Sequence, residues 1–149
     1  MQPDNIFPTF PCSVQYVRFQ QNGKPFLIAN FHGTSHPGSK LDTPDRMEQS
    51  RKILSFLENE KGEKILGGDF NLMPDTQSIR MIEQSGMRNM IAEFSIRSTR
   101  SEFALNSYPE DDRQYFADYV FVSAGIRIKN FMAPNMAVSD HLPLIMEFE

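Results

Sequence analysis

The eight residues KILGGDFN, numbers 64 to 71, decide the fold of this chain. The apolar run that starts them is typical of a short buried strand, and the two glycines lead it into a loop at Asp69. One residue separates Asp69 from Asn71, so in extended backbone both side chains lean to the same face. A carboxylate beside a carboxamide can hold a hard cation or a water and can hydrogen-bond a phosphoryl oxygen. The stretch therefore predicts a buried strand that ends in a polar, chemically useful loop.

Helices are predicted on both sides of that strand. Before it, Thr43 is typical of an N-cap, and Pro44 occupies the first helical position, where its missing N–H is no loss. After it, Asp75 or Thr76 is expected to cap a second helix that ends near Gly86. The strand is thus bracketed by two helical segments.

Strands are predicted toward both ends of the chain. Asn22-Gly23 between two β-prone runs predicts a hairpin over 13–30, and a loop rich in Gly, Ser and Pro follows it. Segment 91–113 has weak periodicity and is expected to be irregular, with at most short strands. Three more strands are expected, over 116–123, 126–132 and 142–148, with a turn at 124–125. Alternating strands and helices followed by a run of strands indicate a layered α/β (α+β) domain.

Composition favours one ordinary domain over residues 1–149. The chain has 149 residues, of which 40% are hydrophobic and 23% charged. A chain of this length can bury roughly 70% of its unfolded surface, so a core needs no disulfide or structural metal. The single cysteine, Cys12, forms no internal bridge, is interpreted as a passive strand-entry residue, and favours a reducing, cytoplasmic compartment.

Charge and hydropathy exclude some classes of function. The net charge of −4 and pI near 5.4 argue against a protein that grips nucleic acid mainly through counterion release, although a locally basic site remains compatible. Met1–Pro11 lacks the basic and apolar regions of a signal peptide, and no window approaches about 18 uninterrupted apolar residues. We expect no membrane span.

Two further clusters carry polar groups at strand ends. Asp118 interrupts a β-prone run, where an unpaired carboxylate would be costly to bury. Ser139-Asp140-His141 supplies a partner, because a carboxylate on one imidazole nitrogen fixes the tautomer and stabilises the charged ring. Taken alone, each cluster has a plain alternative: Asp69 and Asn71 as turn residues, Asp118 as a strand-edge charge, and His141 as a surface histidine.

Together, the clusters resemble a known family. His32, the 68–71 stretch, Asp118-Tyr119-Val120-Phe121 and Ser139-Asp140-His141 occur in the chain order of the endonuclease/exonuclease/phosphatase superfamily. That superfamily includes pancreatic-type deoxyribonucleases, abasic-site endonucleases, sphingomyelinases and inositol polyphosphate phosphatases. The resemblance implies a deoxyribonuclease-like four-layer α/β/β/α sandwich, of which these strands and helices form a part.

The resemblance also implies roles for individual residues. Asp69 would orient or deprotonate the attacking water, and Asn71 would bind a phosphoryl oxygen. Asp140, with Asp69, would help to hold Mg²⁺ or Mn²⁺, which neutralises charge on the phosphate and on the leaving oxygen.

The histidines also receive roles from the resemblance. His141, held by Asp118, would stabilise the charge that develops on the phosphate. His32 would lie opposite His141 and bind the phosphate or protonate the leaving group. His36 matches no family position and is interpreted as a loop residue.

The sequence departs from the family near its N-terminus. Family members have an early Asn and a metal-binding Glu before the segment that matches His32, whereas here Asp4 is the only carboxylate before His32 and the first Glu is Glu48. We therefore expect residues 1–149 to match the C-terminal portion of the family domain without the N-terminal portion, and to have weak activity or none.

A missing N-terminal portion would also leave apolar sheet surface exposed, which favours self-association or pairing with an N-terminal partner segment. The side chains expected on that surface are Val14, Val17, Ile28, Val120, Val122, Ile126 and Ile145.

Two functions from different classes follow. The first is a divalent-metal-dependent phosphoester hydrolase of the nuclease or phosphodiesterase type, with nucleic acid or a phospholipid or inositol phosphate head group as substrate. Arg97, Arg100 and Arg113 are interpreted as solvated surface residues that do not choose among these substrates. The second is a catalytically silent truncated domain that acts as a structural or interaction module. A metal-independent hydrolase is disfavoured, because no Ser or Cys has a recognisable nucleophile setting.

Overall fold

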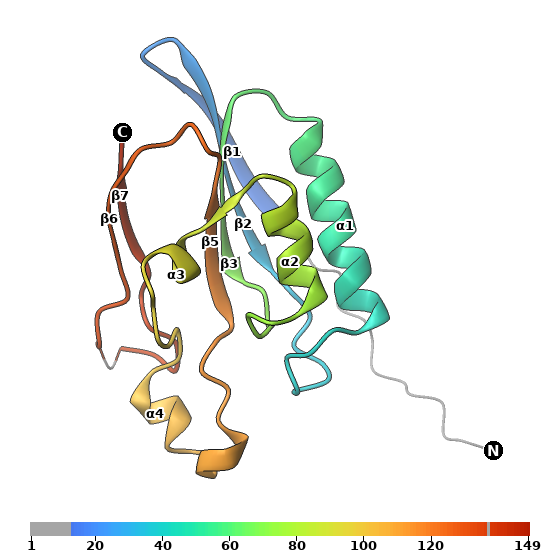
Figure 1. Cartoon of the computed structure of the whole chain (residues 1–149), viewed down its shortest axis with the longest axis vertical. Helices are drawn as coiled ribbons and strands as arrows, with labels where there is room; N and C mark the ends of the chain where they lie inside the picture. The colour runs from blue at the N-terminus through green and yellow to red at the C-terminus, as the bar shows by residue number, and fades with distance from the viewer. Residues whose placement is uncertain (1–12, 137) are drawn as a thin grey trace, which may run out of the picture.

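The computed structural model describes residues 13–136 and 138–149, which form a mixed α/β structure (Figure 1). Cys12 and the Met1–Pro11 segment lie outside the described residues. Figure 1 labels the helices and strands. In chain order they are β1 (Val14–Gln21), β2 (Lys24–His32), α1 (Pro44–Glu58), β3 (Glu63–Asp69), α2 (Gln77–Gln84), β4 (Arg88–Asn89), α3 (Met90–Glu93), α4 (Glu102–Leu105), β5 (Asp118–Val122), β6 (Ile128–Met132) and β7 (Ile145–Phe148).

Five strands form the main sheet in the order β1-β2-β3-β5-β4, and β6 and β7 form a separate two-stranded sheet. The predicted hairpin is confirmed, because β1 and β2 pair antiparallel around the turn at Asn22-Gly23. β2 and β3 pair in parallel, with α1 as the crossover between them, while β5 pairs antiparallel with both β3 and β4. The 64–71 stretch thus lies at the centre of the sheet.

Helices α1 and α2 lie together along one face of this sheet, and β6–β7 lie on its other side (Figure 1). The side chains buried under the helices come from alternate positions of the central strands. They are Leu27, Ala29 and Phe31 on β2, Leu66 on β3, and Tyr119 and Phe121 on β5, packed in one cluster with Ile53, Leu57, Ile79 and Ile82. Among the helices in the described part of the chain, none is both long and apolar enough to cross a membrane.

The predicted helix boundaries are confirmed by their caps. Thr43 accepts a hydrogen bond from the backbone N–H of Arg46 and caps α1, and Pro44 follows at the first helical position. Of the two candidates for the second cap, Thr76 is the one whose side chain accepts from the backbone N–H of Ile79. Gly86 follows α2 with φ +92°, the left-handed conformation that ends helices well.

Segment 91–113 is largely irregular, as predicted, but its short ordered pieces are helical. It holds the end of α3, all of α4 and a 3-10 turn at Glu110–Asp112. Among the described residues, its one β contact is an isolated bridge between Arg100 and His141. Side-chain caps start the two helices, because Asn89 and Ser101 accept backbone N–H groups of α3 and α4.

The expected apolar sheet surface is present only in part. Val17 and Ile145 are about half exposed, at 54% and 48%. The expectation is wrong for Val122 and Ile126, which are buried at 0% and 2%. β6–β7 closes over that end of the sheet and brings the ring of Phe148 to 6.4 Å from the ring of Phe26. Of the expected residues, those that stay half exposed therefore lie on the outer strand β1 and on β7.

Asp42 joins the loop before α1 to the start of α2. Its carboxylate accepts from the backbone N–H groups of Gln77 and Ser78, at 2.6 and 3.0 Å, and from the Ser78 hydroxyl at 2.6 Å. Burial raises the pKa of Asp42, but the hydrogen bonds from Ser78 and Gln77 outweigh it, and the pKa lies below its ordinary value.

Asp42→Asn should reduce the free energy of unfolding at pH 7 by about 1 kcal/mol, the usual value of a helix-capping carboxylate. A group with a lowered folded pKa stabilises above its unfolded pKa and loses that effect as pH falls through the folded pKa. The difference between variant and wild type should therefore shrink from pH 7 to pH 3 in urea unfolding followed by circular dichroism. Equal differences at both pH values would contradict this origin.

Candidate active site

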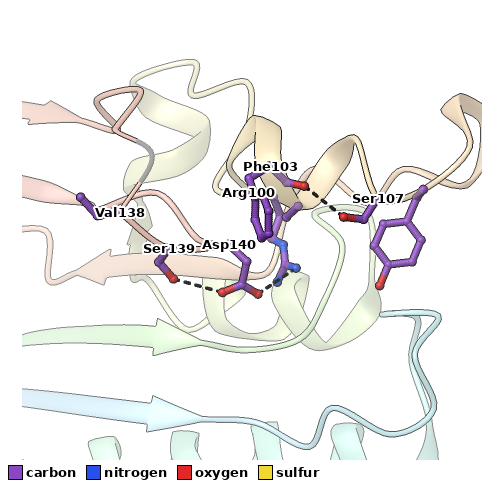
Figure 2. Close-up of a pocket in the computed structure, with 8 residues that line it drawn as sticks. Arg100, Phe103, Ser107, Val138, Ser139 and Asp140 are labelled. Atoms are coloured by element: carbon purple, nitrogen blue, oxygen red, sulfur yellow. Dashed lines mark hydrogen bonds and ion pairs between the residues drawn. The ribbon is translucent and has the colours of Figure 1, made fainter.

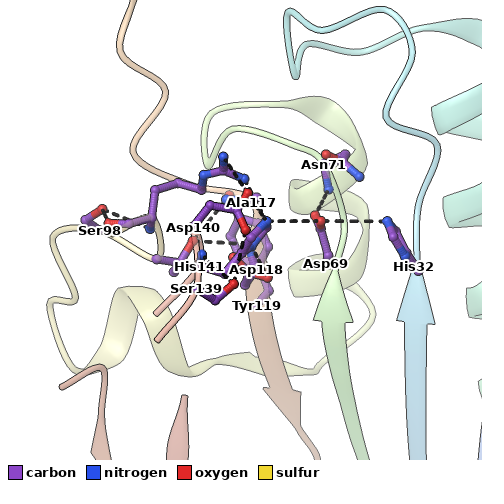
Figure 3. Close-up of polar contacts among 12 residues, drawn as sticks. His32, Asp69, Asn71, Ser98, Ala117, Asp118, Tyr119, Ser139, Asp140 and His141 are labelled. Carbon is purple, nitrogen blue, oxygen red and sulfur yellow. Dashed lines mark hydrogen bonds and ion pairs between the residues drawn. The ribbon is translucent and has the colours of Figure 1, made fainter. Parts of the chain in front are cut away.

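Three of the predicted site residues stand at one end of three adjacent strands. His32 on β2 is the register partner of Asp69 on β3, and Asp69 is in turn the partner of Asp118 on β5. Register partners point to the same face of a sheet, so the three side chains stand side by side (Figure 3). This face is the one opposite α1 and α2, and the strand pairing alone places these side chains together.

Phe70 fixes the loop that follows Asp69. Its side chain is 1% exposed and its ring lies 5.3 to 5.6 Å from the rings of Phe31, Tyr119 and Phe121. Its backbone N–H donates to the carbonyl of Ala117 at 2.8 Å. Phe70, between the polar residues Asp69 and Asn71, therefore fixes the loop by packing into the core and exposes no apolar surface at the site.

His141 reaches this strand end from the segment before β7 and pairs with Asp118. Its Nδ1 lies 2.8 and 3.0 Å from the two carboxylate oxygens of Asp118, the pair expected from the sequence. The hydrogen bond with Asp118 raises the pKa of His141, while burial and the charge of Arg100 act in the opposite direction. Asp118 thus fixes Nδ1 as the protonated nitrogen and leaves Nε2 facing the site.

Asp69 lies between the two histidines. Its Oδ2 is 3.8 Å from Nε2 of His32 and 3.9 Å from Nε2 of His141 (Figure 3). Its Oδ1 accepts a hydrogen bond from the backbone N–H of Asn71 at 2.9 Å. The His32 side chain is 72% exposed and that of His141 26%, so one flank of Asp69 opens to solvent and the other is enclosed.

Three side chains that could hold a metal lie together at this strand end. Asp69, Asp118 and His141 each offer a ligand atom, and these atoms lie within 4.8 Å of one another. Asp140 is outside this group: its carboxylate contacts Nη2 of Arg100 at 3.2 Å and the Ser139 hydroxyl at 3.0 Å. The Oδ2 atom of Asp140 lies 3.5 Å from Nε2 of His141. The structure thus brings Asp69 and Asp118 together, and the metal-binding role expected for Asp140 stays a prediction.

Asn71 is turned inward. It is 5% exposed, and its φ of 52° is a left-handed conformation that Asn tolerates. Its Nδ2 donates to the carbonyl of Gly33 at 3.1 Å, and its Oδ1 accepts from Nζ of Lys40 at 2.7 Å. Neither of these contacts uses the second N–H of the amide, which is the group that would make the predicted contact with a phosphoryl oxygen.

Lys40 is a site residue that the sequence did not indicate. It is 9% exposed, and its Nζ donates to Oδ1 of Asn71. Burial lowers the pKa of Lys40, while the charge of Asp69 acts in the opposite direction. Its loop is held by the buried guanidinium of Arg46, which donates to the carbonyls of Thr34, Pro37 and Leu41. A lone lysine in a Gly/Ser loop carries no motif, which explains why it was missed.

Arg100 is the second residue that the sequence interpretation missed, and its assignment to the solvated surface is wrong. Its side chain is only 15% exposed, and Nη1 lies 2.7 Å from Nε2 of His141. Next to it, the hydroxyl of Thr99 accepts the backbone N–H groups of Ala117 and Asp118 at 3.0 and 3.2 Å. This irregular segment therefore secures the start of β5 and places a guanidinium beside the imidazole.

Comparison with curated proteins gives two related proteins of about twice the length. The chain is 26% identical over 139 residues to a UPF0294 protein of Vibrio campbellii and 24% identical over 144 residues to a UPF0294 protein of Vibrio parahaemolyticus. Each match covers 93% of this chain, and the chain spans 45% of each relative's length. No family model matches the sequence.

Solved structures match the fold over nearly the whole chain. An endonuclease/exonuclease/phosphatase family protein of Bacteroides thetaiotaomicron has a TM-score of 0.66 at 23% identity, over 92% of this chain and 53% of its own. A mannosyl-6-phosphatase of the same organism gives 0.65 at 21%, over 93% and 56%. The catalytic domain of human Nocturnin gives 0.65 at 20%, over 93% and 52%. The chain therefore has the fold of the C-terminal half of an endonuclease/exonuclease/phosphatase domain.

Proposed function

We propose that this chain carries the site of a divalent-metal-dependent phosphoester hydrolase of the nuclease or phosphodiesterase type. The observation that supports it best is the placement of Asp69 between the Nε2 atoms of His32 and His141, with His141 held by Asp118. A carboxylate between two imidazoles can accept a proton from water on one side while charged groups bind a phosphate on the other.

The donor set suits a hard divalent cation. Asp69 and Asp118 supply carboxylate oxygens, the ligands that Mg²⁺ and Mn²⁺ prefer, while the two nitrogens of His141 serve Asp118 and the phosphate. The role predicted for Asp140 in metal binding stays part of this proposal. When bound, such a cation would neutralise charge on the phosphate and on the leaving oxygen.

The protein's own groups act on the water and the phosphate. Asp69 takes the proton of the attacking water through Oδ2, because Oδ1 is already bonded to the Asn71 backbone. His141 and Arg100 now contact each other at 2.7 Å, and a phosphoryl oxygen placed between them would accept from both. His32, on the exposed flank, protonates the leaving group. Asn71 donates its remaining N–H to the phosphate.

The matched structures include a mannosyl-6-phosphatase, whose name states phosphoester chemistry, and the catalytic domain of Nocturnin with a bound sulfate anion. Nucleic acid and phospholipid or inositol phosphate head groups all present the same phosphoester to this site. We favour a diester, since both flanks of Asp69 are lined by groups that can contact an esterified oxygen.

The direct test is hydrolysis of bis-p-nitrophenyl phosphate with Mg²⁺, with Mn²⁺ and with EDTA. We expect turnover only with metal, with EDTA lowering the rate by at least about 10³-fold. His141→Ala should lower it by about 10²- to 10⁴-fold, as expected for loss of one group in proton transfer and charge stabilisation. An equal rate in EDTA would contradict metal dependence, and His36→Ala, outside the site, serves as the control.

A structural or interaction module is the second candidate. The exposed apolar side chains Val17 and Ile145 favour it, because such surface promotes association with a partner segment or a second copy. Wild type and site variants would then be equally inert, and the chain would form a stable complex that is indifferent to Mg²⁺. Sedimentation velocity with and without Mg²⁺ separates this outcome from the enzyme.

A further inference from the structure

A pocket of about 610 Å³ opens next to the site and shares Arg100 and Asp140 with it, while the rest of its lining plays no part in the chemistry described above (Figure 2). It lies between α4 with the residues after it and the segment before β7. The residues that line it and matter here are Arg100, Phe103, Ser107, Tyr108, Ser139 and Asp140. Its volume falls within the range of roughly 300–1,000 Å³ that is usual for small-molecule sites.

Two aromatic side chains at this pocket are unusually exposed. Phe103, in the short helical turn α4, is 73% exposed, and Tyr108, three residues after that turn, is 56% exposed. Ser101 caps that turn at its start, and the Arg113 guanidinium donates to the carbonyl of Leu105 at its end, at 3.1 Å. Exposed aromatic rings on a fixed support, next to a polar site, are typical of a surface that stacks against a ligand.

Arg100 and Asp140 connect the pocket to the phosphate site. Both line the pocket, and both also contact Nε2 of His141, at 2.7 and 3.5 Å. A group esterified to a phosphate at His141 would therefore enter the pocket directly. The hydroxyls of Ser107 and Ser139 and the carboxylate of Asp140 add hydrogen-bonding groups to its wall.

We propose that this pocket binds the nucleobase of a nucleotide phosphodiester, with Phe103 and Tyr108 stacking on the base. The inference rests on the proposed function, because it places the scissile phosphate at His141. A planar ring with polar edges fits two aromatic side chains beside hydroxyl and carboxylate groups, whereas an aliphatic lipid chain would leave those polar groups without partners.

The test compares two diesters with the same leaving group: thymidine 5′-(p-nitrophenyl phosphate) and methyl p-nitrophenyl phosphate. Wild type should prefer the thymidine ester by about tenfold or more in kcat/KM, the scale of one base-stacking contact. Phe103→Ala should bring this preference close to unity, and Phe103→Tyr should restore it. Val17→Ala, an exposed apolar residue on β1, should keep the wild-type preference.

A binding measurement separates this inference from the hydrolase proposal. Calorimetric titration with thymidine 5′-monophosphate and with inorganic phosphate needs no turnover. Tighter binding of the nucleotide that depends on Phe103 supports the pocket even if no ester is hydrolysed. Hydrolysis of both esters at equal rates, unchanged in preference by Phe103→Ala, overturns the pocket and leaves the hydrolase intact. If the protein shows no selective nucleotide binding and no hydrolysis, both proposals are overturned. A preference for bis-p-nitrophenyl phosphate over the thymidine ester indicates a pocket for aryl groups and overturns the nucleobase assignment.

Discussion

Asp69→Asn is expected to lower metal-dependent hydrolysis of bis-p-nitrophenyl phosphate by at least about 10³-fold, because a carboxamide neither accepts the proton of water nor replaces a carboxylate toward a cation. The fold should survive, since the amide oxygen can still accept the backbone N–H of Asn71 that Asp69 now binds at 2.9 Å. The same substitution should weaken Mn²⁺ binding, measured by calorimetry, which gives a readout that needs no turnover.

The control for Asp69→Asn is Asp75→Asn, which changes an exposed carboxylate in the loop that follows the site. It makes the same chemical change with the same change in net charge. Its rate and its Mn²⁺ affinity should match those of wild type. A rate loss of less than about tenfold in Asp69→Asn would remove Asp69 from the proton-transfer role, because general acid–base groups contribute more than that.

Gly68→Ala is expected to destabilise the protein by about 3 kcal/mol or more, through backbone strain and overpacking combined. Gly68 has φ +136°, and a Cβ there would lie 1.9 Å from the carbonyl oxygen of Phe31 and 2.8 Å from its carbonyl carbon. Both atoms are backbone of the paired strand β2, which cannot move aside as a flexible side chain does. Urea unfolding followed by circular dichroism measures the change.

Two other glycines separate the causes of that loss. Gly86 has φ +92°, and a Cβ added there would have no atom within 4 Å, so Gly86→Ala reports the backbone strain alone. Gly38 has open space and no positive φ, so Gly38→Ala should change stability by less than about 0.5 kcal/mol. If Gly68→Ala is no more harmful than Gly86→Ala, strand contact is not what requires glycine at position 68.

Local signals in the sequence were enough for most of the fold. The hairpin turn, the caps Thr43 and Thr76 and the run at 64–68 all depend on residues close together in the chain, where propensity and capping act directly. The burial of Val122 and Ile126 was not foreseen, because it depends on β6–β7 folding back over the sheet. A hydrophobic pattern gives the period of a strand and does not say which distant segment covers it.

Some residues of the candidate site could also be predicted from the sequence, and others could not. Residues of motifs, such as Asp69, Asp118 and His141, could be named from the sequence, because the clusters that hold them occur together in the chain order of a known family. Lys40 and Arg100 could not, because each lies in a segment without periodicity and gains its importance from one contact across the chain, to Asn71 and to His141. Charged side chains on loops look alike in a sequence whether they are solvated or buried.

The register that joins His32, Asp69 and Asp118 also determines when the site can exist during folding. These residues belong to β2, β3 and β5, whose pairing requires the crossover through α1 and the return across segment 91–113. Such long-range pairing forms late, after local turns and helices, because it closes large loops. Protection of the β3 amides from hydrogen exchange and assembly of His32, Asp69 and Asp118 should therefore be gained and lost in one cooperative event. Partly folded chains would expose their strands before these three side chains come together.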